Sequence, residues 1–116
     1  MRTVKKQTYI SDQSALEGFV NEATGSSWIA VDTEFERVRT FYPKLCLIQI
    51  AIPGHSVCVD PLVDLDLTPL CRLFEDPGTL KIFHSARQDL EVLQHSLGVT
   101  LSNIFDTQVA AALTGY

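Results

Sequence analysis

The segment Trp28-Ile-Ala-Val-Asp-Thr-Glu-Phe35 restricts the fold more than any other part of the chain. Its apolar run suits a buried β-strand, and the run ends in two carboxylates, Asp32 and Glu34. Because successive side chains of a strand point to opposite faces, these two acids share one face. The residues expected beside them on that face are Trp28 and Ala30, and those expected on the other face are Ile29, Val31, Thr33 and Phe35.

Two neighbouring acids at a strand end repel each other, so a compensating positive charge is expected beside Asp32 and Glu34. A divalent cation supplies it well, because Mg²⁺ and Mn²⁺ prefer hard oxygen ligands. A solvated strand end that is merely acidic accounts for the same triplet, and Asp-x-Glu alone does not separate the two interpretations.

Composition limits the classes of function. The chain has 116 residues, which suits one domain, and 46% of them are hydrophobic, enough for a core. The net charge of −5 argues against a broad basic surface that grips nucleic acid, so phosphate contacts must be local. Three scattered cysteines indicate a reducing compartment, and no segment has the apolar length of a signal peptide or a membrane span. We therefore expect a cytoplasmic protein that makes no membrane contact.

Periodicity and turn signals outline an alternation of strands and helices. Strands are predicted over residues 4–10, 28–34, 45–52, 56–60, 80–83 and 101–105. Helices are predicted after a cap at residue 11 or 12, over 68–75 and 85–97, and from residue 106 or 107 to 113. The chain begins with hairpin-connected strands, which turn at Pro53-Gly54, and continues with alternating helices and strands. This order predicts an α/β fold, a mixed sheet flanked by helices that are not expected to cover both faces completely.

A third acid, Asp89, lies in the amphipathic helix predicted over 85–97. It borders the apolar stripe of that helix, where an aspartate is unusual unless it is paired. The helix is expected to pack on the sheet, which would bring Asp89 over the end of the strand that carries Asp32 and Glu34. Alone, Asp89 is compatible with a surface acid; together with the other two, it predicts three converging carboxylates.

Five segments carry the remaining signals: Val31-Asp-Thr-Glu-Phe-Glu-Arg37, Thr40-Phe-Tyr-Pro-Lys-Leu-Cys-Leu-Ile-Gln-Ile50, Val59-Asp-Pro-Leu62, His84-Ser-Ala-Arg-Gln-Asp-Leu-Glu-Val-Leu93 and Phe105-Asp-Thr-Gln108. Each segment alone is a weak signal, but five in one order at suitable spacing are a strong one. Together they resemble the N-terminal part of ribonuclease D, which belongs to the DEDD 3′–5′ exonucleases. The resemblance runs from about residue 29 to the end of the chain.

The resemblance implies a ribonuclease H-like fold and hydrolysis of phosphodiester bonds at RNA 3′ ends, in single-stranded RNA or tRNA precursors. It also implies that Asp32, Glu34 and Asp89 are catalytic and bind two Mg²⁺ or Mn²⁺ ions, which lie ~4 Å apart in sites of this kind. Such ions neutralise the charge that builds on the phosphate. Residues 1–116 would then form the N-terminal portion of one 3′–5′ exonuclease domain.

The family's third motif, Tyr-x-x-x-Asp, has no counterpart in this sequence, because Tyr116 is the last residue. We therefore expect a fragment truncated at the C-terminus, which is inactive alone and binds Mg²⁺ weakly. Asp106 is a candidate for the missing carboxylate, but an aspartate at a helix start is better explained as an N-cap.

Four further residues are candidates for substrate contact. Thr33 could offer backbone contacts to the terminal nucleotide, and Phe35 could form a stacking wall or part of the core. His84 precedes the helix of Asp89 and could touch a phosphate or a sugar, or make a structural hydrogen bond. Gln49 is polar within an apolar strand, so it either contacts substrate or is satisfied internally.

Other interpretations fit parts of the sequence. A non-catalytic remnant of an exonuclease fold, kept for binding RNA or protein, would share every motif above. A phosphate-accepting domain could use Asp60, but the parallel sheet that it needs conflicts with the predicted hairpin. The basic residues Arg37, Arg39 and Lys44 suit either a solvated loop or contact with RNA. An incompletely covered sheet would favour self-association.

Overall fold

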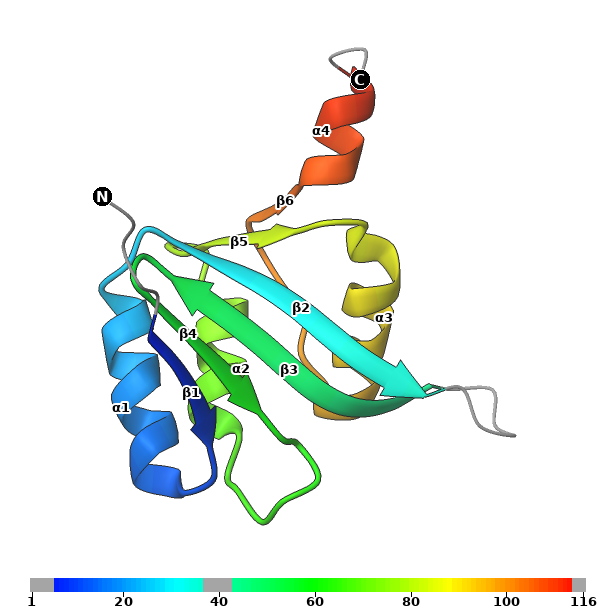
Figure 1. The fold of residues 1–116 in the computed structure, drawn as a ribbon. Coiled ribbons are helices and arrows are strands. Elements are labelled where there is room, and N and C mark those ends of the chain that lie inside the picture. Colours follow the sequence, from blue (N-terminus) through cyan, green and yellow to red (C-terminus); the bar gives the residue numbers. More distant parts are fainter. Residues whose placement is uncertain (1–5, 37–42, 114–116) are drawn as a thin grey trace.

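The computed structural model describes residues 6–36 and 43–113, which form a six-stranded mixed sheet with its helices (Figure 1). The strand order is β1-β4-β3-β2-β5-β6. The elements in chain order are β1 (Lys6–Ile10), α1 (Gln13–Thr24), β2 (Trp28–Glu36), β3 (Lys44–Ile52), β4 (His55–Val59), α2 (Thr68–Glu75), β5 (Leu80–Phe83), α3 (Ala86–Leu97), β6 (Ile104–Asp106) and α4 (Thr107–Leu113).

Strands β2, β3 and β4 run antiparallel to their neighbours in this group, whereas β1, β5 and β6 add parallel pairings at the two sides. The β3–β4 hairpin turns at the predicted Pro53-Gly54, where Gly54 takes a positive φ of 79° that glycine adopts without strain. This antiparallel centre is incompatible with the all-parallel sheet that a phosphate-accepting domain built on Asp60 would need.

Burial alternates along each strand and marks one covered face. Across the sheet, Thr33 pairs in register with Ile48, then Val59, then Ile10, and all four side chains are buried. Asp32 precedes Thr33 and points to the opposite face of the sheet. It is exposed and pairs in register with Gln49 on β3, which is half-buried. Helices α1, α2 and α3 supply the cover, burying residues such as Leu16, Phe19, Leu70, Phe74, Val92 and Leu93. Incomplete cover was predicted, and among residues 6–36 and 43–113 no helix covers the second face of the sheet.

Local capping explains where these helices begin and end. Asp12 caps α1, because its carboxylate accepts the Ala15 amide at 2.8 Å. Helix α3 ends at Gly98, whose φ of 69° lies in the left-handed region. Helix α4 differs from the other three: it leads away from the sheet (Figure 1), and none of its residues is buried.

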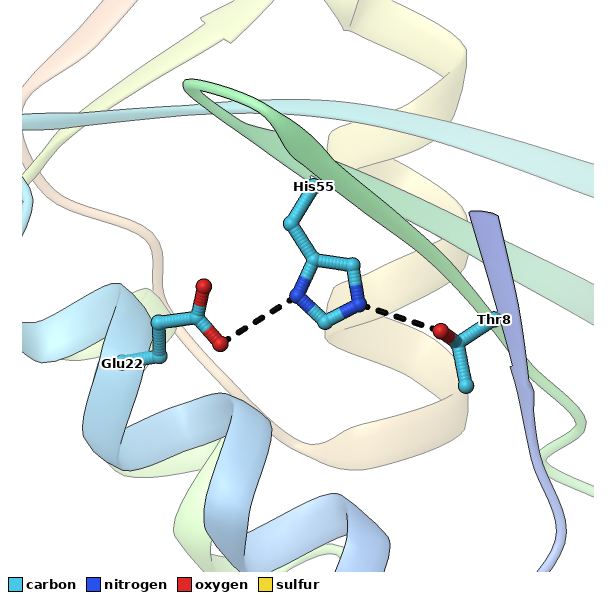
Figure 2. Close-up of polar contacts among 3 residues, drawn as sticks. All are labelled: Thr8, Glu22 and His55. Carbon is cyan, nitrogen blue, oxygen red and sulfur yellow. Dashed lines mark hydrogen bonds and ion pairs between the residues drawn. The ribbon is translucent and has the colours of Figure 1, made fainter. Parts of the chain in front are cut away.

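A polar network fastens α1 to the sheet (Figure 2). The His55 ring, at the start of β4, contacts the Thr8 hydroxyl through Nε2 at 3.1 Å and the Glu22 carboxylate through Nδ1 at 3.2 Å. Phe19 meets the same ring edge to face, with the centroids 5.4 Å apart. The consecutive elements β1 and α1 are therefore joined to the distant strand β4 at one imidazole.

Most predicted elements are found, with shifts at their ends. Helix α2 and strand β5 have the predicted bounds, and β2 runs two residues beyond its prediction, with a register shift between Glu34 and Phe35. Strand β6 starts at residue 104 rather than 101, because Asn103 takes a positive φ of 59° and turns the chain there. The predicted strand start at residue 4 and the basic residues Arg37 and Arg39 lie outside the described residues. In the described part of the chain, no helix has the length and apolar character needed to cross a membrane.

Candidate functional site

The open face of the sheet forms a hollow of about 540 Å³ over the middle of β2 and the neighbouring strands β3, β4 and β5. Small side chains make room for it, since Ala30 and Ala51 face each other in register on β2 and β3. Its polar lining includes Asp32, Gln49, His84 and Thr107. A volume of this order is typical of small-ligand sites.

Asp89 is buried beneath the strand that carries the first two acids. Only 6% of its surface is exposed, and it accepts a hydrogen bond from the hydroxyl of Thr33, which is itself 7% exposed. Asp32 turns back to the same residue, because its Oδ1 accepts the Thr33 amide at 3.0 Å. The helix and strand predicted to meet therefore do meet, with Thr33 between the two carboxylates.

Burial raises the pKa of the Asp89 carboxyl, because charge is costly away from water. The Thr33 hydroxyl opposes this shift by stabilising the anion, and the negative charges of Asp32 and Asp106 add to it. Among the residues that the structure describes, no positive group contributes to the pKa of Asp89, and a buried carboxylate without a positive partner is costly.

Glu34 is exposed and lies two residues beyond Asp32, beside the register shift in β2. The predicted convergence of three carboxylates is therefore not found: within residues 6–36 and 43–113, no three acidic, imidazole or thiol side chains lie close enough to hold one metal ion. The donor chemistry of Asp32, Glu34 and Asp89 nevertheless suits Mg²⁺ or Mn²⁺, since all three offer hard oxygens.

His84 stands at the end of β5 on the rim of the hollow. Its Nδ1 lies 2.8 Å from the Thr107 hydroxyl, which also bonds to the Phe83 carbonyl at 3.2 Å. A structural hydrogen bond, one of the two roles predicted for this histidine, is therefore present. Its Nε2 makes no hydrogen bond within the described residues and is available to a ligand in the hollow.

Asp106 caps two helices rather than one. Its carboxylate accepts the amides of Gln108 and Val109 at the start of α4, and those of Ser85 and Ala86 at the start of α3. These bonds lower the pKa of the Asp106 carboxyl, and the bond from the Ala86 amide has the largest effect. The predicted N-cap role is confirmed, and all of these contacts are to backbone.

The other predicted contacts are divided between the two faces. Gln49 lines the hollow, and its amide nitrogen lies 3.9 Å from the Cys58 sulfur. It therefore has an internal partner and also borders the space proposed for a ligand. Phe35 is half-buried and packs against the core. Thr33 was predicted to offer backbone contacts to a nucleotide, but its amide bonds to Asp32 and its side chain to Asp89. Lys44 is exposed.

Two features of the site escaped the sequence analysis. Thr107 lines the hollow and holds His84, although it was considered only as a helix cap; its position directly after Asp106 was the available signal. Cys58 accepts weak hydrogen bonds from Gln7 and Gln49, at 3.6 and 3.9 Å. Its contact with Gln49 follows from the pairing of β3 with β4, which sequence alone does not give.

Comparison with known sequences gives a consistent set of relatives. The profile of the family described as 3′–5′ exonuclease matches residues 7–116. The protein named Ribonuclease D from Bartonella henselae is 42% identical over 108 residues, covering 92% of this chain and 27% of that protein. Ribonuclease D from Gluconacetobacter diazotrophicus is 43% identical over 108 residues, covering 92% of this chain and 28% of its own length. The chain thus spans a little over a quarter of these curated relatives.

Solved structures give the same result. Escherichia coli RNase D, described as an exoribonuclease involved in structured RNA processing, superposes with a TM-score of 0.87 at 36% identity, covering 97% of this chain and 30% of that one. The catalytic core of RRP6 from Trypanosoma brucei also reaches 0.87, at 29% identity, covering 94% of this chain and 31% of its own. These neighbours confirm the predicted resemblance and the predicted fold class, a ribonuclease H-like mixed sheet flanked by helices.

Proposed function

Because this chain belongs to the 3′–5′ exonuclease family, we propose that it supplies part of the active site of a ribonuclease D-type exoribonuclease. Such an enzyme hydrolyses phosphodiester bonds at RNA 3′ ends. The RNA substrate is proposed from the relatives, since Escherichia coli RNase D is described as acting in structured RNA processing. A cytoplasmic location is part of the proposal and is supported by three free cysteines, which suit a reducing compartment.

One observation carries this proposal: two acids from distant motifs, Asp32 and Asp89, reach the same residue, Thr33. An acid buried on a helix that packs against an acidic strand end is costly unless a positive group joins it. Asp32, Glu34 and Asp89 would hold two Mg²⁺ or Mn²⁺ ions, which when bound would neutralise the charge that develops on the phosphate during hydrolysis.

The chain's own residues would then orient the RNA end. The hollow beside Asp32 is large enough for a nucleotide, and the pair Ala30 and Ala51 leaves its floor open. His84, held through Nδ1 by Thr107, would direct Nε2 toward a sugar hydroxyl or a phosphate. Gln49, in register with Asp32, would add an amide contact beside the acids.

The experiment follows Mn²⁺ binding to the purified chain by electron paramagnetic resonance, with Asp32→Asn, Glu34→Gln and Asp89→Asn as test variants. Glu91→Gln serves as the matched control, because Glu91 lies on the same helix as Asp89 and is exposed. We expect weak saturable binding that each test variant reduces and the control preserves. Binding unaffected by Asp32→Asn and Asp89→Asn would refute the metal site.

A second assay incubates the chain with 5′-labelled RNA that carries a single-stranded 3′ tail. We expect RNA to remain intact, because the chain supplies three of the family's four carboxylates. Progressive shortening by the 116-residue chain would contradict that expectation. RNA binding that ignores both Mn²⁺ and the aspartate variants would favour the alternative, a non-catalytic RNA-binding module.

A further inference from the structure

Thr33 occupies a position where an apolar residue would be expected. It belongs to the buried row formed with Ile48, Val59 and Ile10, and the other three members of that row are aliphatic. Valine has nearly the same shape as threonine and suits a strand interior at least as well. The hydroxyl therefore contributes something that packing does not require.

That hydroxyl and the amide of the same residue make two separate contacts with acids. The hydroxyl donates to Oδ1 of Asp89, and the backbone N–H donates to Oδ1 of Asp32 at 3.0 Å. Within the described residues, Oδ2 of each carboxylate accepts no hydrogen bond. One residue thus fixes one oxygen of two different acids and leaves the second oxygen of each available.

We propose that Thr33 is a positioning residue: it holds one oxygen of Asp32 and one oxygen of Asp89, and leaves the Oδ2 atom of each carboxylate for a divalent cation. This inference rests on the proposed function and deepens it. Carboxylates that bind metals are commonly held by hydrogen bonds to their other oxygen, and loss of such a partner typically weakens metal binding by 10–100-fold. Thr33 would not contact RNA through its side chain, because that side chain is buried on the helix-covered face.

The test compares Thr33→Val, which replaces the hydroxyl with a methyl group, with Thr33→Ser, which keeps the hydroxyl. Mn²⁺ affinity of the chain is measured by electron paramagnetic resonance, and folding is checked by circular dichroism. We expect about 10–100-fold weaker binding for Thr33→Val and a change below about 3-fold for Thr33→Ser. Thr8→Val is the matched control, since Thr8 is another strand threonine whose hydroxyl contacts His55 instead.

A second pair keeps the inference testable where valine prevents folding. Thr33→Ser and Thr33→Ala both remove the methyl group and differ from each other in the hydroxyl alone, so only the alanine variant should lose affinity. Equal affinities in either pair would overturn the positioning role while Asp89→Asn still abolished binding. Unchanged binding in both Asp32→Asn and Asp89→Asn, or no saturable binding by the wild type, would instead overturn the proposed function itself.

Discussion

The His55 network offers the sharpest test of how α1 is held to the sheet (Figure 2). In His55→Ala, the half-buried hydrogen bond to Thr8 is lost, which is worth about 1 kcal/mol. The edge-to-face contact with Phe19 adds about 0.5–1.5 kcal/mol. The ion pair with Glu22 adds less than about 0.5 kcal/mol, because 52% of the Glu22 side chain is exposed. We expect a loss of about 1.5–3 kcal/mol in the free energy of unfolding.

Urea unfolding measures this loss directly. Trp28 is the only tryptophan and is half-buried on β2, so its fluorescence reports on the sheet. With a slope of about 1–3 kcal/mol per molar urea, the midpoint should fall by about 0.5–3 M. Glu22→Gln and Thr8→Val are the controls, with expected losses below about 0.5 kcal/mol and near 1 kcal/mol. The reasoning fails if His55→Ala shifts the midpoint no further than Glu22→Gln does.

Three further predictions concern the core and the caps. Phe74→Ala should cost about 3–5 kcal/mol in unfolding free energy, because Phe74 is fully buried, whereas Leu62→Ala at an exposed site should cost less than about 0.5 kcal/mol; equal urea midpoints would refute this. Lys81 is fully buried and its ammonium donates to the Asp76 carbonyl, so Lys81→Ala, which removes the packed stem, should destabilise more than Lys81→Met. Burial lowers the pKa of the Lys81 amine, so burying the charged amine destabilises the fold below the folded pKa, and this cost disappears as pH rises toward 10.5. The stability of Lys81→Met relative to wild type should therefore fall over that interval. Asp106→Ala should lower the thermal midpoint at pH 7 and reduce helix content, because four amides lose their acceptor. The lowered pKa of Asp106 means that its contribution is present above 3.8 and is lost as pH falls through the folded value, so wild type and variant should converge in acid; a constant difference in circular dichroism melts would refute this.

Local signals predicted the elements whose ends they mark. Helix α2 and strand β5 have the predicted bounds because Asp76-Pro77-Gly78 interrupts the chain between them. The predicted start of β6 was wrong by three residues, because Asn103 takes a positive φ and turns the chain there. An asparagine in the sequence does not by itself show that its φ is positive. That turn is tied to the rest of the fold, since the Asn103 carbonyl accepts the Lys81 amide and its side chain bonds to the Pro77 carbonyl.

The candidate site was predictable as a set of acids but not as a set of contacts. Strand alternation predicted that Asp32 and Glu34 share a face, and the helical stripe predicted that Asp89 packs toward the sheet. The partner of Asp89 lies 56 residues away in sequence, and Asp106 reaches amides 20 and 21 residues before it. Such pairs are fixed by tertiary packing, and a periodic pattern carries no information about them.

Strand geometry also explains why a threonine should join the two acids. Asp32 and Thr33 are neighbours, so their side chains leave β2 on opposite faces, one toward the hollow and one toward α3. Helix α3 lies on the covered face and Asp32 points to the open face, so the backbone of β2 separates Asp89 from Asp32. The Thr33 amide meets Asp32 and its hydroxyl meets Asp89, which links the two layers through a single residue. The register shift at Glu34 and Phe35 lies directly beyond it, and irregularities of this kind are common next to active sites, where they redirect a side chain. Asp32 and Thr33, in the middle of β2, are therefore where the two layers of the fold are linked, and we expect substitutions there to alter metal affinity more than stability.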